Sequence, residues 1–95
     1  MNQNEMTEFF RNTEATLHLD GRNELSMTVE YDSNENSVFY ALSAKLPGGR
    51  GRAKFTQVRG YGITPEGARQ TLGFVLTRDH NWAGNPEETN TNESE

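Results

Sequence analysis

Basic residues concentrate in one stretch of the sequence, and they are the side chains whose type and spacing most suggest chemistry. Five cations and no acid fall within fifteen residues: Lys45, Arg50, Arg52, Lys54 and Arg59. Arginines separated by glycine reach phosphate groups freely, and the nearby aromatic side chains Phe55 and Tyr61 are suited to stacking on a base. The stretch predicts contact with a nucleic acid or with an acidic face of a protein, unless it is only a solvated loop kept soluble by its charge.

The remaining reactive side chains do not form a catalytic set. His18 and His80 are isolated from each other, and His80 follows a predicted helix whose dipole favours a cation at that end. The glycines of Gly60-Tyr61-Gly62 precede a helix start, so their N–H groups could hold an anion, or the glycines could simply turn the chain. With no nucleophile motif, paired carboxylates or phosphate-cradling loop, we expect no enzyme activity, no cofactor and no metal site.

Composition and charge predict one small domain with two acidic ends. The 95 residues are 32% hydrophobic and contain no cysteine, so packing must stabilise the fold without disulfides. Because no leader or apolar span is evident, we expect a cytoplasmic protein that makes no membrane contact. The net charge of −5 is divided unevenly, since residues 36–78 are basic while both flanking parts are acidic.

The two ends of the chain differ from its middle. Met6, Phe9 and Phe10 fall on one stripe of a short helix, which Asn4 could cap. From Pro86 to the C-terminus there is no apolar side chain, so a disordered acidic tail is expected. We therefore divide the chain into a short N-terminal helix, an α+β domain and a tail, over residues 1–13, 14–82 and 83–95.

Alternation of apolar and polar residues predicts strands over residues 15–19, 25–31, 38–46 and 53–61. Residues 21–23 are expected to join the first two strands as a hairpin loop, and residues 33–36 to join the next two, so that their apolar side chains share one inner face. The last strand has an irregular pattern, because Phe55 and Val58 cannot share a face without a bulge, and this favours either an edge strand or a bend.

A helix over residues 65–78 is expected to follow the strands. Thr64 can cap it, Pro65 suits its first position, and Glu66 lies near the positive end of its dipole. Its apolar stripe consists of Ala68, Thr71, Leu72, Val75 and Leu76. The inner face that it should cover consists of Ala15, Leu17, Leu19, Leu25, Met27, Val29, Tyr31, Val38, Tyr40, Leu42 and Ala44. The predicted fold class is α+β, a three- to four-stranded antiparallel meander with this helix packed on one face and a short N-terminal helix.

Two families share parts of this pattern. The order of helix, three strands and helix, with Phe55 and Gly60-Tyr61-Gly62 before the last helix, resembles double-stranded-RNA-binding domains. That resemblance implies phosphate contacts at the start of the last helix, where this sequence has Pro65-Glu66-Gly67-Ala68-Arg69 in place of the family's lysine cluster. Residues 62–68 resemble the strand-to-helix junction of HicB-type antitoxin domains, which implies a β-β-β-α core that binds a small toxin.

We expect a small non-enzymatic regulatory or inhibitory binding module, of the kind carried by phages, plasmids or toxin–antitoxin loci, that acts by stoichiometric contact with a protein. Phe39 and Phe74 are large apolar side chains left outside the expected core, so they are its candidate protein interface, and a homodimer is one form of that contact. The alternative is a nucleic-acid-binding protein that uses residues 45–59 together with Tyr61 and Arg69.

Overall fold

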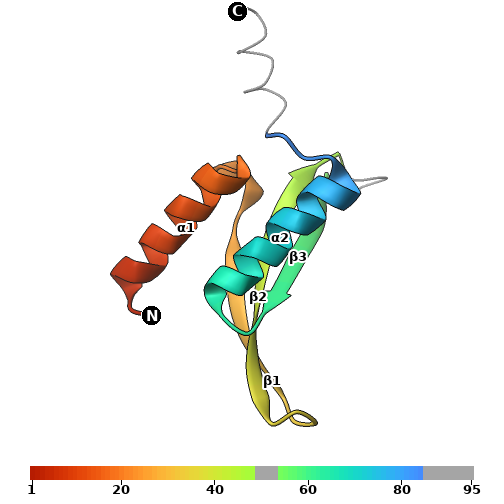
Figure 1. Ribbon diagram of the computed structural model, residues 1–95. Helices are drawn as coiled ribbons and strands as arrows, with labels where there is room; N and C mark the ends of the chain where they lie inside the picture. The colour runs from red at the N-terminus through yellow and green to blue at the C-terminus, as the bar shows by residue number, and fades with distance from the viewer. Residues whose placement is uncertain (49–53, 85–95) are drawn as a thin grey trace, which may run out of the picture.

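The computed structural model describes residues 1–48 and 54–84 and shows an α+β fold (Figure 1). Its three-stranded antiparallel sheet has the order β1-β2-β3, and two helices lie side by side against one face of the sheet, here called the inner face. The elements follow one another as α1 (Gln3–Leu17), a short 3₁₀ helix η1 (Gly21–Asn23), β1 (Ser26–Asp32), β2 (Ser37–Pro47), β3 (Phe55–Gly62) and α2 (Pro65–His80).

Helix α1 is capped two residues before the expected Asn4 and ends beyond the expected residue 13. Asn2 caps it instead: Asn2 Oδ1 accepts a hydrogen bond from Glu5 N at 2.8 Å, and Glu5 Oε1 accepts one from Asn2 N at 2.9 Å. This reciprocal capping box satisfies two N–H groups at the helix start. The helix then continues to Leu17.

The predicted strand over residues 15–19 is wrong, because its first half belongs to α1. Leu17 lies one turn after the buried Thr13 and two turns after the buried Phe9, so it continues the same helical stripe. His18, with a φ of 59°, ends the helix in the left-handed conformation. A three-residue alternation of apolar side chains fits a helix end as well as a strand.

The predicted hairpin loop at residues 21–23 is also wrong, and those residues form η1. Asn23 is 1% exposed and makes two hydrogen bonds with its side chain. Its Oδ1 accepts from Asp20 N at 2.9 Å, and its Nδ2 donates to Lys45 O at 2.7 Å. This buried amide therefore fastens the connection between α1 and β1 to strand β2.

The expected pairing of the next two strands is confirmed. β1 and β2 form an antiparallel hairpin around residues 33–36, with Tyr31 opposite Val38. Asp32 Oδ1 accepts a hydrogen bond from Asn34 N at 3.0 Å within the turn. The apolar side chains of the two strands consequently share the inner face, as the alternation predicts.

Strand β3 is an edge strand and not a bend, which decides between the two expected alternatives, and it is regular. It pairs with β2 without a break from Tyr40 opposite Gly62 to Pro47 opposite Phe55. No bulge is needed in this paired stretch, because Val58 points to the inner face and Phe55 to the outer one. The irregular sequence pattern results from an apolar side chain on each face.

Helix α2 covers the inner face beside β3. The predicted cap is confirmed, since Thr64 Oγ1 accepts a hydrogen bond from Gly67 N at 2.9 Å. Thr71, expected in the apolar stripe, is exposed, while Val75 is half-buried. The buried apolar core consists of Phe9, Leu19, Leu42, Ala44, Leu46, Val58, Ala68, Leu72 and Leu76.

Two glycines of β3 allow α2 to approach the sheet closely. A Cβ atom added at Gly60 would lie 2.2 Å from Leu72 N, and one at Gly62 would lie 2.4 Å from Ala68 N. Any other residue would therefore collide with the backbone of the helix. The close packing of α2 on β3 therefore accounts for glycine at these two positions, and neither a chain turn nor a bound anion is needed to account for it.

Candidate binding surfaces

The inner face continues beyond the part that α2 covers. β3 ends opposite Tyr40, so residues 29–40 continue as a two-stranded hairpin arm that extends away from the helices (Figure 1). On its inner face, Val29 and Tyr31 are each 61% exposed and Val38 is 47% exposed. The expectation that the last helix covers these side chains is wrong, because α2 begins where β3 ends and runs back over the sheet, away from the arm.

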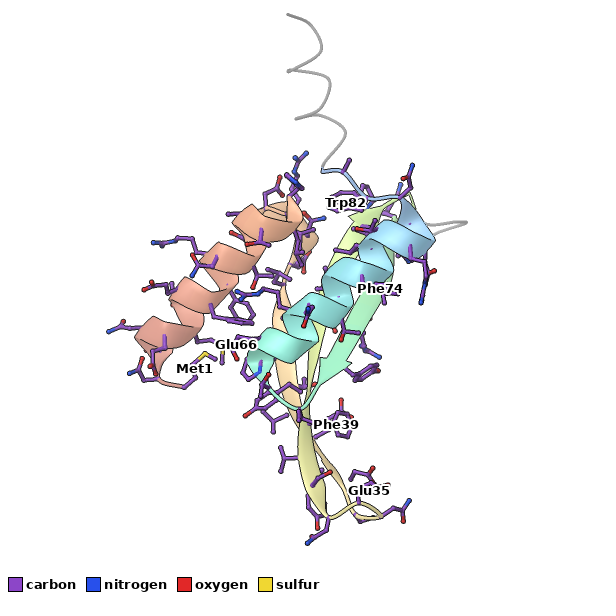
Figure 2. All side chains as sticks on the ribbon, viewed as in Figure 1. Met1, Glu35, Phe39, Glu66, Phe74 and Trp82 are labelled. Atoms are coloured by element: carbon purple, nitrogen blue, oxygen red, sulfur yellow. The ribbon has the colours of Figure 1, made fainter. Side chains whose placement is uncertain are left out.

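A hollow of about 520 Å³ lies between the arm and the start of α1. Its apolar lining residues are Met1, Met6, Met27, Val29, Tyr40 and Pro65. Two carboxylates, Glu5 and Glu66, complete it, and Figure 2 shows Glu66 close to Met1. Val29 belongs both to the hollow and to the arm, so the two are continuous. We call Val29, Tyr31, Val38 and this hollow the inner arm surface.

The outer face of the sheet brings aromatic and basic side chains together. Phe39 of β2 and Tyr61 of β3 contact each other with ring centroids 5.9 Å apart and planes at 63°. Lys45 Nζ lies 4.5 Å from the centroid of the Phe55 ring. The register of the strands places Arg59 on this same face. We call Phe39, Lys45, Phe55, Arg59 and Tyr61 the outer patch.

The predicted nucleic-acid or acidic-partner residues thus separate into three groups. Lys45, Phe55, Arg59 and Tyr61 lie together in the outer patch, with the exposed Lys54 next to it in sequence. Arg69 lies elsewhere, since its guanidinium is 5.0 Å from the Phe9 ring between the two helices. Outside the described residues lie Arg50, Arg52, Ala53 at the predicted strand start, and the predicted tail from residue 85 onward.

The two predicted protein-interface residues belong to different surfaces (Figure 2). Phe39 is half-buried on the outer face of the sheet, whereas Phe74 is 59% exposed on α2, which packs against the opposite face. The Arg78 guanidinium lies 4.8 Å from the Phe74 ring. A hydrogen bond from Arg78 lowers the pKa of the neighbouring Asp79.

Three polar contacts that position these surfaces were not predicted from the sequence. Besides the amide of Asn23, the fully buried Thr13 donates its hydroxyl to Phe9 O at 2.7 Å within α1. Trp82 Nε1 donates to Leu17 O at 3.1 Å and so joins the segment after α2 to the end of α1. The sequence signal that could have revealed such a contact is a polar residue on an apolar helical stripe, such as Thr13.

Neither a metal site nor a membrane span is found among the described residues. Within them, no three histidine, cysteine or acidic side chains are grouped so as to hold a metal ion. None of the described helices has the length and apolar character that crossing a membrane requires. The chain matches no family model, no curated protein and no solved structure. A function must therefore be inferred from the inner arm surface and the outer patch themselves.

Proposed function

We propose that this chain is a small non-enzymatic regulatory or inhibitory module that acts by stoichiometric contact with a protein partner through its inner arm surface. The exposure of Val29 and Tyr31, at 61% each, carries the proposal. Contiguous exposed apolar surface of this kind commonly marks a protein contact. A partner that covers it gains about 25 cal/mol for each Å² of apolar surface removed from water.

The turn of the arm supports a preformed site. The Tyr31 hydroxyl donates a hydrogen bond to Asn36 Oδ1 across the turn. Asp32 Oδ1 accepts from the N–H groups of Asn34 at 3.0 Å and Glu35 at 3.4 Å. Because these bonds already hold the turn, the arm loses little conformational entropy when it binds.

Charge around the inner arm surface indicates the chemistry of the partner. Glu5 and the exposed Glu66 line the hollow beside its apolar wall. A partner segment that combines apolar with basic side chains is complementary to both features and is steered toward them. The resemblance to HicB-type antitoxin domains, which bind a small toxin, supports an inhibitory form of this contact.

The experiment first identifies the partner and then measures its affinity for the chain. The tagged protein is crosslinked in cells that naturally carry its gene, the captured protein is identified and purified, and the pair is titrated by calorimetry. We expect one-to-one binding. Val29→Ser and Tyr31→Ser should each weaken it by about tenfold or more, because each removes roughly 1.5 kcal/mol of apolar burial.

Phe74→Ser is the matched control, since Phe74 is as exposed as Tyr31 but lies on α2. It should bind the partner as the unchanged chain does. The proposal fails if no captured protein binds in a fixed ratio, or if Phe74→Ser weakens binding as much as Tyr31→Ser. It also fails in this form if sedimentation shows a dimer of the chain joined through the arm, because the partner would then be a second copy.

A further inference from the structure

The outer patch offers aromatic rings on an open, flat part of the sheet. Tyr61 is 49% exposed and Phe55 is 44% exposed, at opposite ends of β3. They are six residues apart on one face of the strand, a span of about 20 Å. Between them the central strand contributes Lys45 and the small residues Ala41 and Ser43, which are 2% and 7% exposed. The rings therefore stand at the two ends of a shallow track.

Cations lie along this track between the rings. Arg59 is exposed and its Nε donates to Ser43 Oγ at 3.2 Å, while among the described residues no carboxylate pairs with its guanidinium. Lys45 lies over the Phe55 ring and also forms an exposed ion pair with Glu24 at 3.1 Å. Because this ion pair is exposed, Lys45 can exchange the Glu24 carboxylate for another anion at little cost in free energy.

Among the described strand residues, the acidic side chains of the outer face lie on the arm, while Glu24, which precedes β1, reaches Lys45. Glu30 lies opposite Phe39, and Asp32 follows at the tip of the same strand. The outer face is therefore basic between β2 and β3 and acidic toward the turn. An anionic ligand is attracted to the first region and repelled from the second, which limits its path to the track.

Rings and cations in this arrangement match single-stranded nucleic acid. Unpaired bases stack on exposed aromatic side chains while the backbone phosphates meet basic ones. In a duplex the bases already stack on each other, and the two-stranded arm carries Glu30 and Asp32 on this face, which the phosphates of a groove would repel. We propose that the outer patch binds single-stranded nucleic acid, with Tyr61, Phe39 and Phe55 contacting bases and Arg59 and Lys45 contacting phosphates. This inference is independent of the proposed protein contact, which uses the opposite face.

The test is fluorescence anisotropy of the full chain with labelled oligothymidylate, oligouridylate and a duplex of the same length, over a series of salt concentrations. We expect a single strand to bind more tightly than the duplex. Tyr61→Ser should weaken that binding by about fivefold or more. Arg59→Gln should weaken it and reduce the slope of log affinity against log salt by about 0.7.

The chain offers a matched control in the Phe74 and Arg78 pair on α2, another exposed aromatic side chain with an arginine beside it. Phe74→Ser and Arg78→Gln should leave oligonucleotide binding unchanged, and so should Val29→Ser on the arm. Thermal melting monitors the fold, and Phe55→Ser repeats the test at the other end of the track.

Four results would overturn the inference. One is no anisotropy change at low salt with either single strand. The second is a duplex bound as tightly as the single strands. The third is a polyglutamate peptide that competes as well as an oligonucleotide, since that result would assign the cations to an acidic protein surface. Equal losses in the α2 control variants would likewise contradict it.

Discussion

The inner face of the sheet has two halves with the same alternating apolar pattern and different surroundings. Leu42 and Ala44, next to α2, are 0% exposed, whereas Val29 and Tyr31 on the arm are 61% exposed. Strand length accounts for the difference, because β3 ends opposite Tyr40 and α2 turns back from that end. An apolar face identified from alternation can therefore be partly core and partly exposed surface in one hairpin.

Truncating one side chain in each half gives the largest contrast. We expect Leu42→Ala to lower the free energy of unfolding by about 4 kcal/mol, because it leaves a cavity under α2. Val29→Thr keeps the branched shape preferred in strands and should cost less than about 0.5 kcal/mol. Urea unfolding of the two variants measures both values. Similar losses would mean that the arm belongs to the core.

Adding one methyl group beneath α2 tests how closely this helix packs on the sheet. Gly60→Ala should cost about 3 kcal/mol, since the new Cβ would meet the backbone at Leu72 N, 2.2 Å away, and the helix would have to move. Gly21→Ala is the control, because nothing lies within 4 Å of a Cβ there. If both variants unfold at the same urea concentration, α2 does not pack as closely on β3 at Gly60 as the structure shows.

Removing the amide of Asn23 should have an intermediate effect on the covered half. Asn23→Ala leaves Lys45 O and Asp20 N without the hydrogen bonds that the side chain supplies, at a cost of about 2 kcal/mol. Asn34→Ala, in the exposed turn of the arm, should change the unfolding free energy little. Urea unfolding of the two variants measures the difference. Equal midpoints would show that the Asn23 side chain does not stabilise the fold through these hydrogen bonds.

Sequence reasoning reached the fold class, the central hairpin and the start of α2, because each depends on local chemistry. Residues 33–36, Thr64 and Pro65 have strong turn or capping preferences of their own. Residues 15–19 were misassigned because their short alternation also fits the stripe of α1, which only the burial of Thr13 and Phe9 reveals.

The candidate surfaces were less accessible to sequence reasoning, because they depend on where elements end in space. Phe39 and Phe74 both look like exposed aromatics in the sequence, yet a sheet and a helix lie between them. The exposure of Val38 follows from the end of β3, a boundary that pattern alone locates poorly. The Phe39 contact with Tyr61 follows from a register that the irregular pattern of β3 concealed.

The central claim is that the arm's apolar side chains serve a partner and not the core. The most direct measurement combines urea unfolding with partner titration for a chain carrying Val29→Ser and Tyr31→Ser together. The account predicts an unfolding midpoint close to that of the unchanged chain and a partner affinity lower by about a hundredfold. A large drop in the midpoint, or an unchanged affinity for the partner, would contradict it.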